Sequence, residues 1–189
     1  MTVPTTIDQA FRDRAAAEGA LDVAFELTDS PVGELLVAAT HRGVCRISFD
    51  AEPEAELEWL ARAYGARVLR APGPVDRTRR ELDEYFAGQR RAFDLAVDLS
   101  ALPSFQQLVL DELRRVPYGA TNTYGGLAAR IGKPRAARAV GGALNRNPVP
   151  IVVPCHRIVG ASGSLVGYAG GLERKERLLA LEGGLLGSA

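Results

Sequence analysis

The fold of the C-terminal half is decided by residues 123–145, which read TYGGLAARIGKPRAARAVGGALN. Thr123 is of a residue type that caps helices, and a short helical pattern follows it over residues 124–131. Gly132-Lys133-Pro134 interrupts that pattern, and a second helix is expected over residues 135–145. Two short helices joined by a tight turn, with basic residues on the second, predict a helix-turn-helix.

Gly141 and Gly142 are unusual because they lie inside the second predicted helix. A glycine in a helix interior costs about 1 kcal/mol relative to alanine. One explanation is tight packing against a neighbouring helix. The other is close approach to a DNA groove, with Arg138 reaching into the base stack, and the basic residues nearby favour it.

The next segment, residues 152–159, places Cys155 beside His156 in a chain with two cysteines and two histidines. Pro154 sets its own backbone geometry, so we expect a buried strand to stop and turn at Cys155. The cationic neighbours His156 and Arg157 are expected to lower the thiol pKa and make Cys155 a nucleophile. The alternative is a buried cysteine that ends a core strand.

Helical patterns flank this central region. A helix is expected from Ser104, as its N-cap, with one apolar face. A flexible Gly-rich loop over residues 167–171 precedes an amphipathic helix over residues 172–181, which ends at Glu182. The apolar residues expected to pack inward are Phe105, Leu108, Val109, Leu113 and Val116 in the first helix and Leu178, Leu179 and Leu181 in the last.

Charge is distributed unevenly although the net charge is zero. Residues 1–98 carry 12 Lys and Arg against 18 Asp and Glu, whereas residues 99–189 carry 11 against 5. Between Glu112 and Glu173 there is no acidic residue. A solvated basic face would explain a short run of this kind, but so long a stretch favours a polyanionic partner.

The N-terminal half predicts a small α/β domain. Alternating strands over residues 23–29, 34–40 and 44–49 form an antiparallel meander, and helices over residues 55–64 and 75–87 cover it. Gly88 is expected to close the second helix. A peripheral helix is expected over residues 6–18, and residues 93–99 form a strand or an extended linker.

We therefore expect two domains, with a boundary near residue 99 where the charge balance changes sign. Residues 1–98 form an α/β support domain with a short antiparallel sheet and covering helices. Residues 99–189 form a mainly α, winged helix-turn-helix-like domain that binds DNA and carries the chemistry.

Composition predicts a soluble, globular, cytoplasmic protein, with 47% hydrophobic and 24% charged residues. No apolar run is long enough to cross a bilayer, and the N-terminus lacks the features of a signal peptide. Cys45 and Cys155 are expected to be free thiols, with Cys45 only packing in a strand. His41 is expected in a solvated turn, and no metal site is predicted.

Five motifs together resemble the O6-alkylguanine-DNA alkyltransferases over about residues 103–183. They are Tyr124, residues 133–141 (KPRAARAVG), Asn147-Pro148, Pro154-Cys155-His156-Arg157 and residues 167–172 (GYAGGL). The N-terminal half resembles the small α/β domain of that family only loosely. A tryptophan common in the first C-terminal helix is Leu110 here, and a glycine that commonly opens that helix is replaced around residues 101–104; both are expected at packing positions.

The resemblance implies irreversible transfer of an alkyl group from O6-alkylguanine in duplex DNA to Cys155, after the base is flipped out of the helix. O4-alkylthymine is a second candidate lesion. His156 would take the thiol proton through a water, Glu182 would orient the imidazole, and Tyr124 would donate to the departing base. A thioether has no easy route back to a thiol, so this methyltransferase is expected to act once and then stay inactive.

The resemblance also assigns the surrounding residues. The substrate pocket would include Asn147, Tyr168, Ile158 and Ala169. Contacts with the minor groove would come from Arg138, Arg135, Ala137, Gly141, Gly142 and Arg146, with Arg138 filling the gap in the base stack. Double-stranded DNA is the expected partner, with no cofactor and no membrane, and the protein is expected to be a monomer; cooperative binding on DNA stays open. Some relatives bind zinc in the N-terminal domain, but Cys45 and His41 alone do not make such a site.

Two other classes of protein compete with this interpretation. A helix-turn-helix module could sense damage or regulate transcription, with Cys155 purely structural. A Cys-His hydrolase would act repeatedly on esters or peptides and would not need an acid-free basic stretch. Relatives that lack the cysteine bind DNA without repairing it, and the presence of Cys155 argues against that class.

Overall fold

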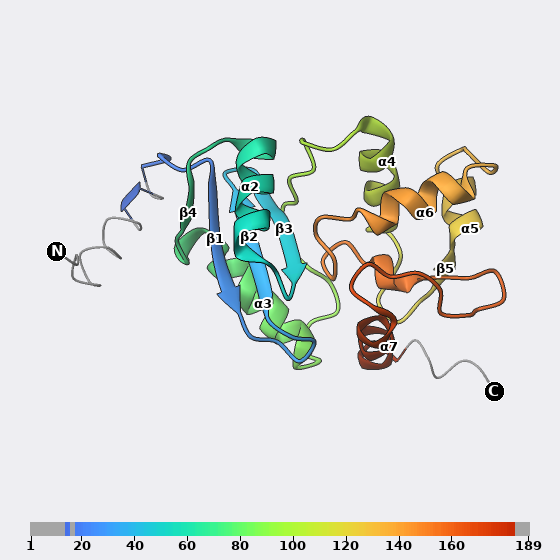
Figure 1. The fold of residues 1–189 in the computed structure, drawn as a ribbon. Helices are drawn as coiled ribbons and strands as arrows, with labels where there is room; N and C mark the ends of the chain where they lie inside the picture. The colour runs from blue at the N-terminus through green and yellow to red at the C-terminus, as the bar shows by residue number, and fades with distance from the viewer. Residues whose placement is uncertain (1–13, 16–17, 184–189) are drawn as a thin grey trace. The chain divides into compact units, whose positions relative to one another are not determined.

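The computed structural model describes residues 14–15 and 18–183 (Figure 1). Apart from residues 14–15 and 18, the peripheral helix expected over residues 6–18 lies outside the described part. The chain divides into two compact units, Met1–Glu84 with Asp94–Ala101, and Tyr85–Phe93 with Leu102–Ala189. No described helix is long and apolar enough to span a lipid bilayer.

The first unit contains a four-stranded sheet in the order β3-β2-β1-β4. Its first three strands, β1 (Val23–Thr28), β2 (Leu35–Thr40) and β3 (Gly43–Phe49), pair antiparallel, so the predicted meander is confirmed. The edge strand β4 (Val68–Arg70) pairs parallel with β1 and was not expected, because three residues give no readable alternation. Of the strand or linker expected over residues 93–99, Val97 alone bridges to Val44.

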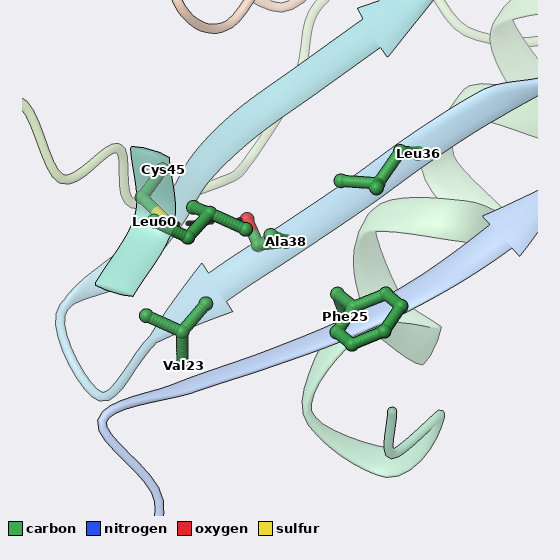
Figure 2. Close-up of a cluster of buried hydrophobic side chains, with 6 residues drawn as sticks. All are labelled: Val23, Phe25, Leu36, Ala38, Cys45 and Leu60. Atoms are coloured by element: carbon green, nitrogen blue, oxygen red, sulfur yellow. Dashed lines mark hydrogen bonds between the residues drawn. The ribbon is translucent and has the colours of Figure 1, made fainter. Parts of the chain in front are cut away.

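Helices pack on this sheet through its apolar side chains. Helix α2 (Pro53–Tyr64) contributes the fully buried Leu60 to a core cluster with residues of β1, β2 and β3 (Figure 2). Trp59 is partly buried at the margin of that cluster, as its position in the helical pattern indicates. A short 3-10 turn, η1 (Gly73–Val75), leads into α3 (Asp76–Phe86), and Gly88 follows with a positive φ of 71°.

The second unit is mainly helical. Helix α4 (Ser104–Leu113) packs against α5 (Tyr124–Arg130) and α6 (Ala137–Asn145), and these two helices form the predicted helix-turn-helix. The side chain of Thr123 accepts a hydrogen bond from the Gly126 amide, which confirms the expected cap. Two short parallel strands, β5 (Asn122–Thr123) and β6 (Ile158–Val159), and the last helix, α7 (Leu172–Leu181), complete the unit.

Three expectations about these helices were wrong in detail. Pro103, not Ser104, precedes α4, and no side chain caps that helix. Leu108 is 43% exposed because it lies on the face of α4 away from the buried Val109 and Leu113. Helix α6 starts at Ala137, so Arg135 belongs to the preceding turn.

The buried strand expected before Cys155 does not form. Residues 148–153 are buried but run through turns, in which the Val152 amide bonds to the Pro150 carbonyl and the Val153 amide to the Val149 carbonyl. Pro148, Pro150 and Pro154 lack amide hydrogens, so the segment cannot donate a regular ladder of hydrogen bonds. Cys155–Arg157 then forms one turn of 3-10 helix, η2.

Candidate functional site

Cys155 lines a pocket of about 380 Å³ in the second unit. The side chain is 8% exposed, so the sulfur is sheltered but reaches the pocket. Helices α5 and α6 supply one wall and the loop after β6 supplies another. The lining residues are Tyr124, Gly141, Gly142, Leu144, Asn145, Cys155, Val166, Gly167, Tyr168 and Ala169.

The resting thiol is not acidified, contrary to the expectation from its cationic neighbours. Burial raises the pKa of Cys155 to about 11, although hydrogen bonds, first of all from the Asn147 side chain, act in the opposite direction. The Asn147 Nδ2 group donates to Sγ at 3.1 Å and to the Val153 carbonyl at 2.8 Å. His156 supplies no charge, because burial also lowers its pKa and favours the neutral imidazole.

Glu182 holds the imidazole from behind the pocket. His156 Nε2 lies 2.9 Å from Glu182 Oε1, and both side chains are fully buried. Burial by itself raises the pKa of Glu182, but hydrogen bonds from His156 and Arg157 lower it to about 2. Glu182 is therefore a carboxylate at neutral pH, and the contact with His156 that the sequence could not establish is present.

The positive charge of Arg157 does not act on the thiol because its guanidinium is paired with Glu182. Its Nε and Nη2 groups donate to Glu182 Oε2 and Oε1, each at 2.8 Å, and Nη1 donates to the Val116 carbonyl at 2.6 Å. The guanidinium thus faces the carboxylate. Such bidentate, charge-assisted pairs are among the strong hydrogen bonds in proteins.

The other imidazole nitrogen, His156 Nδ1, is buried and has no hydrogen-bonding partner among the described residues. Buried polar groups are nearly always paired, so an unpaired nitrogen in the residue next to Cys155 requires an explanation. Since Nε2 lies against the Glu182 carboxylate, that nitrogen would carry the proton and Nδ1 would be the acceptor. The imidazole is therefore arranged to receive a proton.

Within the pocket lining, Tyr124 is bonded to the loop after β6. The Tyr124 hydroxyl donates to the carbonyls of Val166 at 3.2 Å and Gly167 at 3.4 Å. Burial and then the nearby Cys155 raise the pKa of this tyrosine, so the phenol keeps its proton. Tyr168 and Ala169, which the family resemblance assigns to the substrate pocket, line this pocket.

Lys175 was not predicted as part of this site. Its buried Nζ donates to the carbonyls of Ile158 at 2.6 Å and Val166 at 2.8 Å, and so ties α7 to the pocket loop. A sequence signal was present, since Lys175 falls on the same helical face as the buried Leu178 and Leu179. A lysine at such a position needs buried acceptors.

Two predicted pocket residues occupy other places. Ile158 is fully buried in β6 and does not line the pocket. Asn147 also lies outside the lining, but it contacts the sulfur directly. Neither difference could be predicted from the sequence, because the direction of these side chains depends on the turns around Cys155.

The residues predicted to bind DNA lie on α6 and around its ends. Arg135, Arg138 and Arg146 are exposed, and Ala137 is partly exposed. Gly141 and Gly142 line the pocket, and a Cβ added at Gly141 would stand 3.7 Å from the Tyr124 ring. That separation is an ordinary van der Waals contact. Packing within the chain therefore does not by itself require glycine at this position.

Cys45 and His41 form no comparable site. Cys45 is buried in the sheet, and its Sγ lies 3.5 Å from the Ala38 carbonyl, consistent with the packing role predicted for it. His41 is exposed in the turn between β2 and β3. Within residues 14–15 and 18–183, no three His, Cys, Asp or Glu side chains gather in a cluster that could hold a metal.

Comparison with known proteins gives the same result for both halves of the chain. Residues 104–184 match the model of the 6-O-methylguanine DNA methyltransferase DNA binding domain, and residues 23–99 match that of its ribonuclease-like domain. A methylated-DNA–protein-cysteine methyltransferase of Methanosarcina acetivorans is 40% identical over 162 residues, covering 84% of this chain and 97% of the relative. The corresponding protein of Mycobacterium leprae is 44% identical over 157 residues, covering 82% and 88%.

Solved structures show the same fold. A crystal structure of Mycobacterium tuberculosis OGT in complex with DNA superposes with a TM-score of 0.74 at 39% identity, covering 85% of this chain and 92% of that one. The O6-methylguanine methyltransferase of the same organism superposes with a TM-score of 0.73 at 38% identity, covering 85% and 93%. The chain described here belongs to the 6-O-methylguanine DNA methyltransferase family.

Proposed function

We propose that this protein repairs alkylated DNA directly, by moving the alkyl group from O6 of a guanine in duplex DNA to Sγ of Cys155. O4-alkylthymine is a second lesion of the same chemistry. The observation that carries the proposal is the pocket of about 380 Å³ into which the Cys155 thiol opens, with a buried His156–Glu182 pair behind it. Pockets of this size commonly bind small molecules.

The reaction begins with a neutral thiol, so the substrate must arrive before the proton leaves. His156 Nδ1 takes that proton, directly or through one water, while Glu182 stabilises the imidazolium that forms. Asn147 Nδ2 donates to the thiolate. The proposed transfer therefore does not require a thiolate at rest in this protein.

The thiolate then attacks the alkyl carbon. The S–C bond forms as the C–O6 bond breaks, and the electron pair of that bond goes to the guanine. Tyr124 exchanges its bonds to Val166 and Gly167 for a bond to the departing base, gives it a proton, and recovers one from solvent. The product is guanine in DNA and S-alkylcysteine in the protein, and one molecule acts once.

The lesion reaches the pocket by rotation out of the duplex. We assign the minor-groove contacts to Arg135, Ala137, Arg138, Gly141, Gly142 and Arg146, with Arg138 occupying the space that the base leaves. Gly141 fits this assignment, because its missing side chain widens the pocket beside Tyr124 rather than relieving a clash within the chain. An alkylated base with weakened pairing costs less to flip, which contributes selectivity.

We assign repair to residues 99–189 and a supporting role to residues 1–98. Ile158 is buried in β6 and does not line the pocket. The protein is proposed to work as a monomer in the cytoplasm, where thiols stay reduced. Several copies bound side by side on one duplex are compatible with this assignment.

Mass spectrometry of the intact protein tests the proposal. The protein is incubated with a duplex containing one O6-methylguanine, and with the unmodified duplex as control. We expect the mass of one methyl group to be gained per chain, the lesion to disappear in equal amount, and a second addition of lesion to stay unrepaired. An unchanged protein mass with the lesion intact would contradict the proposal.

A further inference from the structure

The carboxylate that holds the catalytic imidazole receives a hydrogen bond from a residue far upstream in the sequence. The Tyr85 hydroxyl donates to Glu182 Oε1 at 2.7 Å, a distance shorter than that from His156 Nε2 to the same oxygen. Tyr85 is fully buried. It lies in the segment matched to the ribonuclease-like domain, outside the segment matched to the DNA binding domain.

Burial fixes the direction of this hydrogen bond. Desolvation, and then the charge of Glu182, raise the pKa of Tyr85 far above its ordinary value. The phenol is therefore protonated at every pH at which the protein works. An ionised carboxylate only accepts, so Tyr85 is the donor.

Glu182 Oε1 is shared by three donors, namely Tyr85, His156 and Arg157, whereas Oε2 accepts from Arg157 and from the Gly119 amide. Each donor draws electron density from the carboxylate and lowers its capacity to stabilise a positive imidazole. The donors also hold the carboxylate in one orientation. A change at Tyr85 must therefore reach His156 through Glu182.

The surroundings of Tyr85 hold its ring in place. Its neighbours are Phe86, Phe93 and Tyr118, with ring centroids 5.4, 5.3 and 6.1 Å away. All four aromatic residues belong to the second unit, because Tyr85–Phe93 packs there although Glu84 and Asp94 on either side do not. This segment is thus part of the unit that contains Cys155.

We propose that Tyr85 is a positioning residue for alkyl transfer, which sets the orientation of Glu182 and, through it, the proton affinity of His156. The predicted effect of Tyr85 on the transfer rate rests on the proposed function, whereas its predicted effect on the titration of His156 does not. Loss of the hydroxyl leaves more negative charge on Oε1 for the imidazole. His156 then binds a proton more tightly and is neutral only at higher pH.

The test compares Tyr85→Phe with Tyr118→Phe. Tyr118 is the matched control, because its hydroxyl also bonds near this site but to the Leu181 carbonyl at 3.0 Å instead of the carboxylate. The titration of His156 is followed by NMR of the imidazole ring, with the exposed His41 as internal reference in a chain of two histidines. The rate of methyl transfer from O6-methylguanine duplex is measured over the same pH range.

Because Glu182 and the imidazole lose their fixed orientation, we expect Tyr85→Phe to slow methyl transfer about three- to tenfold at neutral pH. Because the imidazole then binds its proton more tightly, the His156 titration and the acidic limb of the rate profile should move upward by about half a pH unit. Tyr118→Phe should leave both midpoints in place. A His156 titration unchanged in Tyr85→Phe would overturn the inference. If the wild-type protein transfers no methyl group, the proposed function fails, whereas the titration still decides the role of Tyr85.

If Tyr85→Phe does not fold, 3-fluorotyrosine placed at position 85 keeps the ring and the hydroxyl. Fluorine makes the phenol a stronger donor, so it draws more charge from Glu182 Oε1. The His156 titration should then move downward, opposite to the effect of removing the hydroxyl. An upward movement or none at all would count against the inference.

Discussion

Cys45 and Cys155 have similar burial and different surroundings. Both thiols are buried, and burial raises the pKa of Cys45 to about 12 and that of Cys155 to about 11. Cys45 packs among the aliphatic and aromatic side chains of the first unit (Figure 2), with the Ala38 carbonyl as its polar neighbour. Cys155 opens into a pocket and accepts a hydrogen bond from Asn147.

The difference teaches that a perturbed pKa does not by itself distinguish the thiol that we propose as the nucleophile. What distinguishes Cys155 is access to a pocket, a donor aimed at the sulfur, and a buried base with an orphan nitrogen. These features let His156 take the thiol proton once the substrate is in the pocket, while the neutral resting thiol reacts only slowly with other electrophiles.

The largest effect is expected when each cysteine in turn is replaced by serine. Cys155→Ser should abolish methyl transfer from O6-methylguanine duplex, because a serine hydroxyl is a far weaker nucleophile. Cys45→Ser should retain transfer, with some loss of stability from a hydroxyl placed in the sheet core. The amount of repaired guanine is measured by chromatography. Transfer that persists in Cys155→Ser and disappears in Cys45→Ser would reverse the two roles.

Two buried or partly buried ion pairs extend the comparison to stability. Glu182→Gln should lower the free energy of unfolding by about 3–5 kcal/mol, because it leaves Arg157 buried without a counter-charge. Glu56→Gln breaks the pair with Arg46 in the first unit, where both side chains keep some contact with water, and should cost about 1 kcal/mol. Chemical denaturation of both variants at neutral pH measures the two values. Equal losses would contradict the contrast between the units.

The same glutamate predicts a dependence of stability on pH. The pKa of Glu182 is about 2 in the folded protein and ordinarily 4.5, so its contribution is fully present above about pH 4.5. That contribution is lost as the pH falls from about 4.5 toward 2, because over this range the unfolded chain takes up a proton at Glu182 while the folded protein does not. Wild-type protein should therefore lose stability more steeply than Glu182→Gln between pH 4.5 and 2, as followed by circular dichroism in denaturant.

Much of this site could be predicted from the sequence because it follows from short motifs. Thr123, the turn after α5 and the basic α6 indicate a helix-turn-helix, and the adjacent Cys155 and His156 indicate the reactive group. The thiol pKa could not be predicted in the same way. The pKa of Cys155 depends on the pairing of Arg157 with Glu182, a contact in the folded structure that the sequence does not reveal.

Tyr85 and Lys175 were missed for a related reason. Tyr85 lies on the apolar face of a predicted helix. No neighbouring residue indicates that its hydroxyl bonds to Glu182, which is 97 positions later in the chain. Lys175 is one of several charged residues in α7, so its charge alone does not single it out. The turns before Cys155 were predictable from the sequence but were missed. The three prolines of residues 148–154 cannot donate the hydrogen bonds of a strand, but the apolar residues between them favoured the prediction of a buried strand.

Removing the donor to the sulfur should have a smaller effect than removing the sulfur itself. Asn147→Ala should slow methyl transfer about ten- to a hundredfold, since a hydrogen bond to a charged group contributes about 1.5–3 kcal/mol. Asn145→Ala is the control, because Asn145 lines the same pocket without a bond to the sulfur. Single-turnover kinetics give both rates. Equal slowing in the two variants would remove the special role of Asn147.

The smallest expected difference between the two cysteines is in their rates of reaction with a small thiol reagent. Cys155 should react about tenfold faster than Cys45 at the same pH, since its pKa is lower and the pocket admits the reagent. Its rate should rise about tenfold per pH unit through the neutral range, as expected for a thiol that ionises near 11. Iodoacetamide labelling followed by peptide mapping gives both rates. A plateau below pH 8 would indicate a thiolate at rest.

Peptide mapping after repair tests the central claim most directly. The protein is reacted with an excess of O6-methylguanine duplex, digested, and each cysteine peptide is weighed. One methyl group on the peptide that contains Cys155, with the Cys45 peptide unmodified, is the predicted result. A methyl group on Cys45, or repaired guanine with both cysteines unmodified, would contradict the account.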